Sequence, residues 1–326
     1  MLSNFSNQRI LVTGASGFIG SHLCLRLCKE GAEVHAISRV HNTECSDGVR
    51  WWLGDLAEIA SVQNIMAKIN PDIIFHLAGY PVGSRGLEHV LPSFRNNLMS
   101  TVNLLTVASE IGCQRIVLAG SLEEPDGSGD LKAVSSSPYA VAKWSCSAYA
   151  RMFHALYALP VVMMRVFMVY GPAQQDLNKI IPYTIISSLK GQPPMLTSGQ
   201  RQVDWIFVED VVEAFLVAAH AKNIEGATLD VGSGQLTSIQ TVVEQITCMI
   251  NPLIKPSYGA MPDRPYEQIR VADTKKTYDL VGWKTLISLE EGLKRTTNWY
   301  SKQAVDQNLY KNYMKGTNYG NGQGAH

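Results

Sequence analysis

A glycine-rich turn near the amino terminus constrains this chain more than any other feature. Residues 9–13 have the pattern of a buried strand, which runs into Gly14-Ala15-Ser16-Gly17-Phe18-Ile19-Gly20 and then into a helical pattern. Glycines at such a strand-to-helix turn permit a tight bend, close approach of a pyrophosphate and close packing of the helix. The helix N-terminus also favours negative charge. The turn therefore predicts a dinucleotide site built from Gly14, Ser16, Gly17, Phe18, Ile19 and Gly20.

Short β-branched runs alternate with longer amphipathic stretches through the first half of the chain. This alternation predicts an α/β fold, a Rossmann-type doubly wound parallel sheet. We expect strands at 9–13, 34–38, 49–53, 73–77, 115–119 and 161–167, and long helices at 91–111 and 137–158.

After Tyr170 the alternation gives way to turns rich in Gly and Pro. This change predicts a smaller carboxyl-terminal α/β substrate domain. The expected Rossmann domain spans 1–170 plus about 201–235, and the expected substrate domain spans about 171–200 and 236–316. Residues 317–326 are rich in Gly, Asn and Gln and are predicted to be a disordered tail.

Composition excludes several classes of function. The 28 Lys and Arg residues balance 28 Asp and Glu residues, so no basic surplus is available for a polynucleotide. No apolar run approaches the roughly 20 residues of a membrane span, and the amino terminus has no signal-peptide pattern, so we expect a cytoplasmic protein without membrane attachment. The six cysteines form no C-x-x-C pair, and neither a disulfide framework nor a metal site is predicted.

The end of the second predicted strand indicates the kind of dinucleotide. An acidic residue there would accept hydrogen bonds from the ribose hydroxyls of NAD, but this chain has Ser38 and Arg39. A hydroxyl and a guanidinium suit the 2′-phosphate of NADP, so NADP is favoured and NAD is possible. Arg39 as a solvated loop residue is the alternative. Asp55, after the third strand, is expected either to accept from the adenine amino group or to cap a helix.

A tyrosine and a lysine, Tyr139 and Lys143, lie four residues apart at the start of a predicted helix. This spacing places the phenol and the ammonium on one helix face. Ser121 stands at the carboxyl end of the preceding strand, the edge that faces the cofactor in a doubly wound sheet. We expect Ser121 to hold a substrate oxygen, Tyr139 to move its proton and Lys143 to lower the pKa of the phenol while binding the nicotinamide ribose.

With these motifs the chain resembles the extended short-chain dehydrogenase/reductase family of NAD(P)-dependent nucleotide-sugar epimerases, dehydratases and ketoreductases. The resemblance covers about residues 8–300. Its landmarks are Gly14 to Gly20, Gly54-Asp55-Leu56, His76-Leu77-Ala78, Asn97, Ser121, Tyr139 with Lys143, Tyr170-Gly171-Pro172, Asp204 with Asp210, and Arg264. It implies that Leu56, Leu77 and Ala78 also contact the cofactor, that Asn97 contacts the substrate, and that two long helices build a homodimer.

The chain departs from the family pattern at positions that bear on the substrate. Met168 stands where members usually have an asparagine, and the arginine that often precedes Asp204 is replaced by Val203, with Arg201 as a possible substitute. We therefore expect Met168, Arg201 and Arg264 to line the substrate site. Arg264, in a loop flanked by prolines, suits bidentate binding of a diphosphate, and a surface role is its alternative.

Glu123, two residues after Ser121, matches the acid/base glutamate of the sugar-nucleotide 4,6-dehydratases. A capping or solvated carboxylate is the alternative role for Glu123. The resulting hypothesis is an NAD(P)-dependent nucleotide-sugar epimerase or dehydratase acting at C4 of a nucleoside-diphosphate hexose with Ser121, Tyr139, Lys143 and Glu123. Three alternatives stay open: an NADPH-dependent reductase of 4-keto-6-deoxyhexoses, a ketoreductase of a non-nucleotide substrate, and a non-catalytic NAD(P) sensor.

Overall fold

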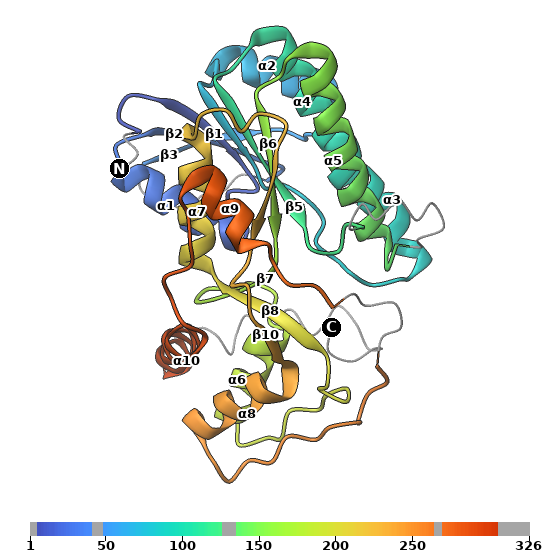
Figure 1. The fold of residues 1–326 in the computed structure, drawn as a ribbon, viewed down its shortest axis with the longest axis vertical. Helices are drawn as coiled ribbons and strands as arrows, with labels where there is room; N and C mark the ends of the chain where they lie inside the picture. Colours follow the sequence, from blue (N-terminus) through green and yellow to red (C-terminus); the bar gives the residue numbers. More distant parts are fainter. Residues whose placement is uncertain (1–4, 41–47, 126–134, 264–268, 306–326) are drawn as a thin grey trace. The chain divides into compact units, whose positions relative to one another are not determined.

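A computed structural model describes residues 5–40, 48–125, 135–263 and 269–305 (Figure 1). The chain divides into two compact units. The first comprises residues 1–167, 211–231 and 273–284, and the second comprises 168–210, 232–272 and 285–326. The predicted Rossmann segment 201–235 is thus shared between the units, because the strand at Gln202–Phe207 pairs outside the main sheet.

A seven-stranded sheet forms the first unit, and every neighbouring pair of strands is parallel. In spatial order the strands are β3 (Val49–Leu53), β2 (Glu33–Ser38), β1 (Arg9–Thr13), β4 (Ile73–His76), β5 (Arg115–Ser121), β6 (Val161–Val166) and β9 (Thr228–Val231). The central strands are buried along nearly their whole length, as expected for a sheet covered on both faces. This is the predicted Rossmann fold.

Helices cover both faces of this sheet (Figure 1). The helices of the first unit are α1 (Phe18–Lys29), α2 (Ile59–Ile69), η1 (Leu87–His89), α3 (Val90–Ser93), η2 (Phe94–Met99), α4 (Ser100–Ile111), α5 (Pro138–Tyr157), α7 (Val208–His220), whose first turn belongs to the second unit, and α9 (Thr274–Val281). Apolar residues of α2, α4 and α5 join one strand face in a single core. On the other face, Arg26 of α1 pairs with Glu213 of α7 at 2.7 Å.

The helix predicted at 91–111 is interrupted in the structure. A short α3 is followed by a π-helical segment, η2, before α4 begins. The side-chain amide of Asn96 donates to the carbonyl of Pro92 at 2.9 Å along this segment. Single π turns inside helices often occur at functional sites. Here the π turn carries Arg95, Asn96 and Asn97, whose side chains each reach a different part of the first unit.

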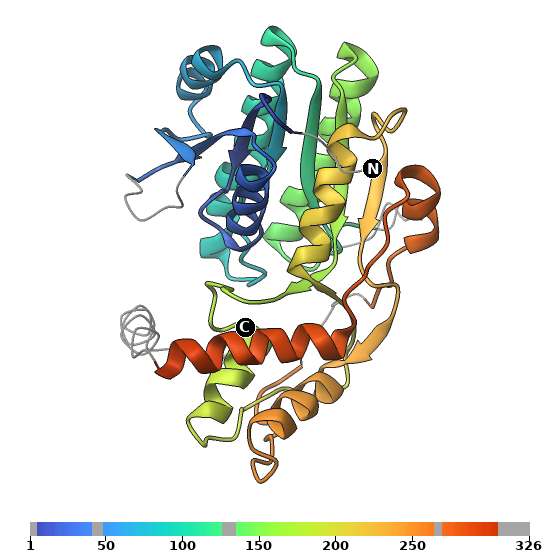
Figure 2. The same cartoon turned by 90° about the vertical axis from the view of Figure 1, so that its left-hand side faces the viewer.

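The second unit contains a three-stranded sheet in the order β10 (Leu236–Ser238), β8 (Gln202–Phe207) and β7 (Met168–Tyr170). Its helices are α6 (Ile180–Leu189), α8 (Ile239–Ile250) and α10 (Leu289–Val305), and Figure 2 shows α10 crossing α6 and α8. Helix α8 begins directly after β10, because Ser238 caps it by accepting from the Thr241 N–H.

A buried carboxylate ties distant segments of the second unit together. Asp204 is 1% exposed and accepts from the backbone and hydroxyl of Ser233, at 2.6 and 2.7 Å, and from the Gly234 N–H at 3.0 Å. Its other contact is the Ala272 N–H, also at 3.0 Å. A buried carboxylate with four donors is fully satisfied, so Asp204 acts as a structural anchor.

Candidate active site

The glycine turn between β1 and α1 leaves no room for a side chain at Gly14 or at Gly20. Gly14 has φ +70°, and a Cβ placed there would lie 2.7 Å from the backbone of Leu77 and Ala78. A Cβ at Gly20 would lie 2.1 Å from the carbonyl oxygen of Gly14. No side chain caps α1 at Gly17, and its first turn has no acidic residue. The turn therefore fits an anionic pyrophosphate, and the predicted residues Ser16, Phe18 and Ile19 lie in it or in the first turn of α1.

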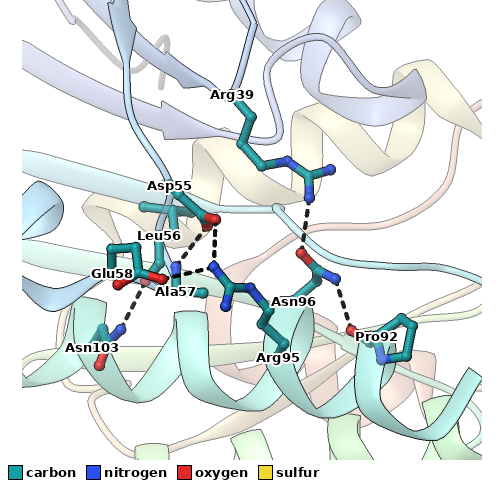
Figure 3. Close-up of polar contacts among 9 residues, drawn as sticks. All are labelled: Arg39, Asp55, Leu56, Ala57, Glu58, Pro92, Arg95, Asn96 and Asn103. Atoms are coloured by element: carbon teal, nitrogen blue, oxygen red, sulfur yellow. Dashed lines mark hydrogen bonds and ion pairs between the residues drawn. The ribbon is translucent and has the colours of Figure 1, made fainter.

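A polar cluster lies beside the carboxyl end of β2 (Figure 3). Arg39 donates from Nη1 to Oδ1 of Asn96 at 3.0 Å. Ser38, the last residue of β2, accepts from the Val40 N–H at 3.3 Å. We call residues Ser38, Arg39, Asp55, Glu58, Arg95 and Asn96 the adenosine edge, after the part of the cofactor that the sequence predicts at this strand end. Glu58 and Arg95 in this cluster were not predicted, because nothing in the local sequence sets them apart.

Asp55 is held from two sides within the adenosine edge. Its Oδ1 accepts from the Ala57 N–H at 2.9 Å, and its Oδ2 pairs with Nη2 of Arg95, also at 2.9 Å. The same Arg95 nitrogen lies 2.8 Å from Glu58 Oε1. Partial burial raises the pKa of Asp55, but the bonds from Ala57 and Arg95 outweigh it and bring the pKa below its usual value. The adjacent Leu56 is fixed through its carbonyl, which accepts from Asn103 at 2.9 Å.

Ser121, Tyr139 and Lys143 gather at the carboxyl end of β5. Ser121 is the last residue of the strand, and Tyr139 lies in the first turn of α5, close enough for the Ser121 side chain to affect the pKa of the phenol. Burial and the negative charge of Glu123 raise the pKa of Tyr139, and this rise exceeds the opposing effect of the Ser121 hydroxyl. Lys143 is 7% exposed and donates from Nζ to the Ala119 carbonyl at 2.8 Å. Burial lowers the pKa of its ammonium group.

Two adjacent glutamates behave differently at the same strand end. Glu123 accepts at Oε2 from the hydroxyls of Ser136 and Ser137, each at 3.3 Å, and its N–H donates to Ser121 Oγ at 3.2 Å. Glu124 is 3% exposed and accepts the Ser121 N–H at 2.7 Å. The structure therefore places Glu123 beside Ser121 and Tyr139, and its catalytic role stays a prediction. The backbone role of Glu124 was missed, because adjacent acidic residues give no sign of which one turns inward.

The segment that leaves β4 also reaches this edge. Leu77 donates its N–H to the Thr13 carbonyl at 3.2 Å, and Ala78 donates to the Thr13 hydroxyl at 3.2 Å. Asn97, predicted to contact substrate, is 1% exposed, and both ends of its amide bind the backbone of Tyr80, at 2.8 and 3.3 Å. Asn97 thus holds a loop in this structure, and its contact with substrate stays a prediction.

The other predicted substrate residues belong to the second unit or lie outside the described residues. Met168, in β7, packs against the apolar core of that unit. Arg201 precedes β8 and is partly exposed, with its carbonyl accepting from the Ile239 N–H at 3.0 Å. Arg264 lies outside the described residues. Their roles stay predictions.

Metal ligands and membrane spans can be assessed only for the residues that the structure describes. Among these, no group of three or more His, Cys, Asp or Glu side chains is placed to hold a metal ion. In the same ranges, no helix combines the length and the apolar composition that crossing a bilayer requires.

Comparison with known proteins places the chain among sugar-nucleotide enzymes. It is 28% identical to a dTDP-glucose 4,6-dehydratase of Haemophilus influenzae, over 90% of this chain and 98% of that protein. It is also 28% identical to a UDP-glucose 4-epimerase of Mycolicibacterium smegmatis, over 91% and 100%. The solved structure of MoeE5 in complex with UDP-glucose and NAD matches with a TM-score of 0.80 and 29% identity, over 90% and 99%.

These similarities support NAD as the cofactor and give no support to the predicted preference for NADP. The prediction of an enzyme from the extended short-chain dehydrogenase/reductase family is confirmed at the level of the family. The model of the family described as "NAD dependent epimerase/dehydratase family" matches residues 10–232, about two thirds of the chain. The chain belongs to the NAD dependent epimerase/dehydratase family.

Proposed function

We propose that this protein acts at C4 of a nucleoside-diphosphate hexose, with Ser121, Tyr139 and Lys143 as its catalytic residues. The observation that carries the proposal is the convergence of Ser121, Tyr139 and Lys143 at the carboxyl end of β5, where Lys143 is fixed to the Ala119 carbonyl. Two hydroxyls and an ammonium at one strand end offer a point at which a substrate oxygen can exchange a proton with the protein. The names of the relatives, which include a 4-epimerase and a 4,6-dehydratase, favour chemistry at this carbon.

Each side chain has a distinct task in this proposal. Ser121 donates to the C4 oxygen of the substrate, and its backbone N–H is held by Glu124, which keeps the strand end in place. Tyr139 moves the proton between that oxygen and the protein. Its raised pKa means that it carries a proton in the absence of ligand, so a nearby positive charge is needed before it can act as a base. Lys143, 7% exposed and fixed to Ala119, holds the nicotinamide ribose.

Bound NAD supplies the hydride acceptor and donor for such a reaction. The residues that would hold it are those of the glycine turn, the adenosine edge, and Leu77 with Ala78. We infer further that this site accepts NADP as well as NAD. The end of β2 offers a hydroxyl and a guanidinium rather than a carboxylate, and both nearby acids, Asp55 and Glu58, are already paired with Arg95.

Cofactor choice can be measured directly. Mass analysis of cofactor released from purified protein identifies NAD or NADP, and titration of both gives their relative affinity. Replacing Ser38 by Asp should lower the affinity for NADP by about tenfold, because a carboxylate then opposes the 2′-phosphate, and should improve NAD. Recovery of NAD alone, with no measurable NADP binding, would remove the inference.

Glu123 determines which step comes after the oxidation of C4. A ketone at C4 acidifies the C5 proton, and a carboxylate beside Ser121 and Tyr139 is placed to take that proton and pass it to the C6 hydroxyl, which leaves as water. The 4-keto-6-deoxy product would then form when the hydride taken from C4 is returned to C6 and a proton is added at C5. The hydroxyls of Ser136 and Ser137 fix one carboxylate oxygen of Glu123, which leaves the other for this task. This arrangement favours a dehydratase, with an epimerase as the nearest alternative.

The reaction is tested by the balance of cofactor. A panel of UDP-, dTDP-, GDP- and CDP-hexoses, incubated without added reductant, should yield a 4-keto-6-deoxy product or a C4 epimer. Thermal shift with the four free nucleoside diphosphates selects the base beforehand. Stoichiometric loss of NADPH with a 4-keto sugar would establish a reductase instead, and no response to any nucleotide would favour a ketoreductase of non-nucleotide substrates or a sensor.

Glu123→Gln separates dehydration from epimerisation. In a dehydratase it should abolish product while bound reduced cofactor still accumulates slowly. The matched control is Glu110→Gln, a carboxylate at the far end of α4 with no place in the site. Full turnover in the Glu123→Gln variant would show that Glu123 is not a catalytic residue.

We infer that the protein forms a homodimer through the face carried by η1, α3, η2 and α5. Large apolar side chains are exposed there, with Leu87 85%, Leu91 75% and Trp144 45% exposed. Apolar surface of this kind is characteristic of interfaces between subunits. Light scattering should report a dimer, and Leu91→Glu combined with Trp144→Glu should shift it to monomer. A monomer in the unaltered protein would overturn the inference.

A further inference from the structure

A chain of buried hydrogen bonds runs beneath the site and passes through His76. The Ala78 N–H donates to Thr13 Oγ1 at 3.2 Å, and Thr13 Oγ1 lies 2.7 Å from His76 Nδ1. On the other side of the ring, Nε2 lies 2.9 Å from Thr101 Oγ1. Thr13, His76 and Thr101 are each at most 2% exposed. The chain thus joins the end of β1, the end of β4 and the first turn of α4.

The partners of the two threonines fix which nitrogen of His76 carries the proton. Thr101 donates its only hydroxyl proton to the Asn97 carbonyl at 2.7 Å, so it accepts from His76 Nε2–H. Nδ1 is then without a proton and accepts from the Thr13 hydroxyl, whose oxygen in turn accepts from Ala78. Every donor in the chain has one acceptor, which satisfies all of these buried groups.

A second tether acts on the same segment two residues further on. The amide of Asn97 accepts from the Tyr80 N–H and donates to the Tyr80 carbonyl. Gly79 lies between the two tethered residues, and a Cβ there would stand 2.6 Å from Asn97 Oδ1 and 3.8 Å from Lys143 Nζ. The backbone at 78–80 is therefore held at both ends, with Lys143 close to its middle.

We propose that His76 is a positioning residue which, as its Nε2–H tautomer, sets the backbone of residues 78–80 against Lys143 and so shapes the nicotinamide end of the cofactor site. The proposal rests on the assignment of Lys143 to the nicotinamide ribose under the proposed function. His76 touches neither cofactor nor substrate in this arrangement, and acts through Thr13 and Ala78.

A substitution at Thr101 disrupts this hydrogen-bond network at a position outside the glycine turn. Thr101→Val keeps the shape of the side chain but removes the acceptor of His76 Nε2–H, whereas Thr101→Ser keeps a hydroxyl. Thr247→Val is the matched control. Thr247 is a threonine 3% exposed whose hydroxyl bonds only to carbonyls of its own helix, α8, in the second unit. Affinities for NADH and for ADP, measured by fluorescence and calorimetry, separate the two ends of the cofactor.

Thr101→Val should raise the dissociation constant of NADH about tenfold, the size expected when a buried donor loses its acceptor. The affinity for ADP, which lacks the nicotinamide half, should stay close to that of the unaltered protein. Thr101→Ser should restore NADH binding, and Thr247→Val should lower the midpoint of thermal unfolding without changing the affinity for NADH. Unchanged NADH binding in Thr101→Val, or an equal loss for ADP and NADH, would overturn the proposal.

A spectroscopic measurement tests the tautomer even if Thr101→Val fails to fold. Two-bond ¹H–¹⁵N correlation spectra of the unaltered protein, with His76 assigned through His76→Gln, should show a protonated Nε2 and a bare Nδ1. A protonated Nδ1 would overturn the proposal. Failure of the unaltered protein to bind NADH would instead count against the proposed function, so the two failures are distinguishable.

Discussion

The two ends of the proposed cofactor site hold their polar side chains in opposite ways. At the catalytic end, Ser121, Lys143 and His76 are at most 7% exposed and are satisfied mainly by backbone groups and hydroxyls. At the adenosine edge, the side chains of Asp55, Glu58 and Arg95 are 30% to 62% exposed and are satisfied by ion pairs. Both ends lie in the first unit and at the carboxyl ends of its parallel strands.

This difference predicts where substitutions are costly. A buried donor or acceptor that loses its partner keeps the full cost of desolvation, whereas an exposed ion pair gains little and is screened by salt. The catalytic end should therefore respond strongly to single-atom changes and weakly to salt. Substitutions at the adenosine edge should have little effect on the free energy of unfolding but should change the relative affinities for NAD and NADP.

The largest expected effect is on turnover. Tyr139→Phe removes one hydroxyl and keeps the ring, so folding and NADH binding should survive. Turnover should fall by a factor on the order of 10² to 10⁴, as for loss of a general acid/base, and steady-state kinetics with the identified substrate measure it.

Tyr149→Phe is the control for this change, because Tyr149 lies on the same helix and is 40% exposed. It should leave turnover unchanged. Near-normal turnover in Tyr139→Phe would mean that the catalytic end does not depend on this phenol, and the contrast between the two ends would lose its main support.

The next effect is on stability as pH falls. Burial, together with the positive charge of Lys143, lowers the pKa of His76 from an ordinary value of 6.5 to about 3. The unfolded chain binds a proton below pH 6.5 that the folded chain excludes. The contribution of His76 to the free energy of unfolding is therefore fully present above pH 6.5. It decreases as the pH falls toward 3, by at most about 1.4 kcal/mol per pH unit.

Urea unfolding between pH 7 and 5 measures this slope. His76→Gln keeps a donor and an acceptor but does not titrate, so subtracting its curve removes the contributions of His35 and His220, whose pKa values are also lowered by burial. Equal slopes in the two proteins would show that His76 is protonated normally in the folded state. Water would then have more access to His76 at the catalytic end than the burial of this residue indicates.

Local sequence pattern accounts for the sheet. Strands β1 and β3 match the predicted residues, because each is a short β-branched or aromatic run bounded by polar turns. Helix α6 was missed, since its sequence is apolar on nearly every side and gives no helical period. The π turn η2 was missed for a different reason: it continues a helical pattern without a break.

Local pattern also placed Ser121, Tyr139, Lys143 and Glu123 near one strand end, because the topology of a parallel sheet puts residues at its carboxyl edge together. The local pattern did not predict which groups form hydrogen bonds or ion pairs with the residues of the site. Arg95 and Asp55 are 40 residues apart, and His76 and Thr13 are 63 apart. Such partners are determined by tertiary packing, which cannot be predicted from the spacing of residues along the chain.

The smallest expected effect comes from the adenosine edge. Arg95→Met keeps the apolar stem of the side chain but removes the ion pairs to Asp55 and Glu58. Because Arg95 is 48% exposed, the midpoint of thermal unfolding should change little, and the change should shrink further in 1 M NaCl, where charges are screened within about 3 Å.

Arg295→Met is the matched control, since Arg295 is 42% exposed and also pairs with two carboxylates, Glu291 and Glu209. Similar small shifts are expected for the two variants. A large drop for Arg95→Met alone that persists in high salt would show that this edge is organised like the catalytic end.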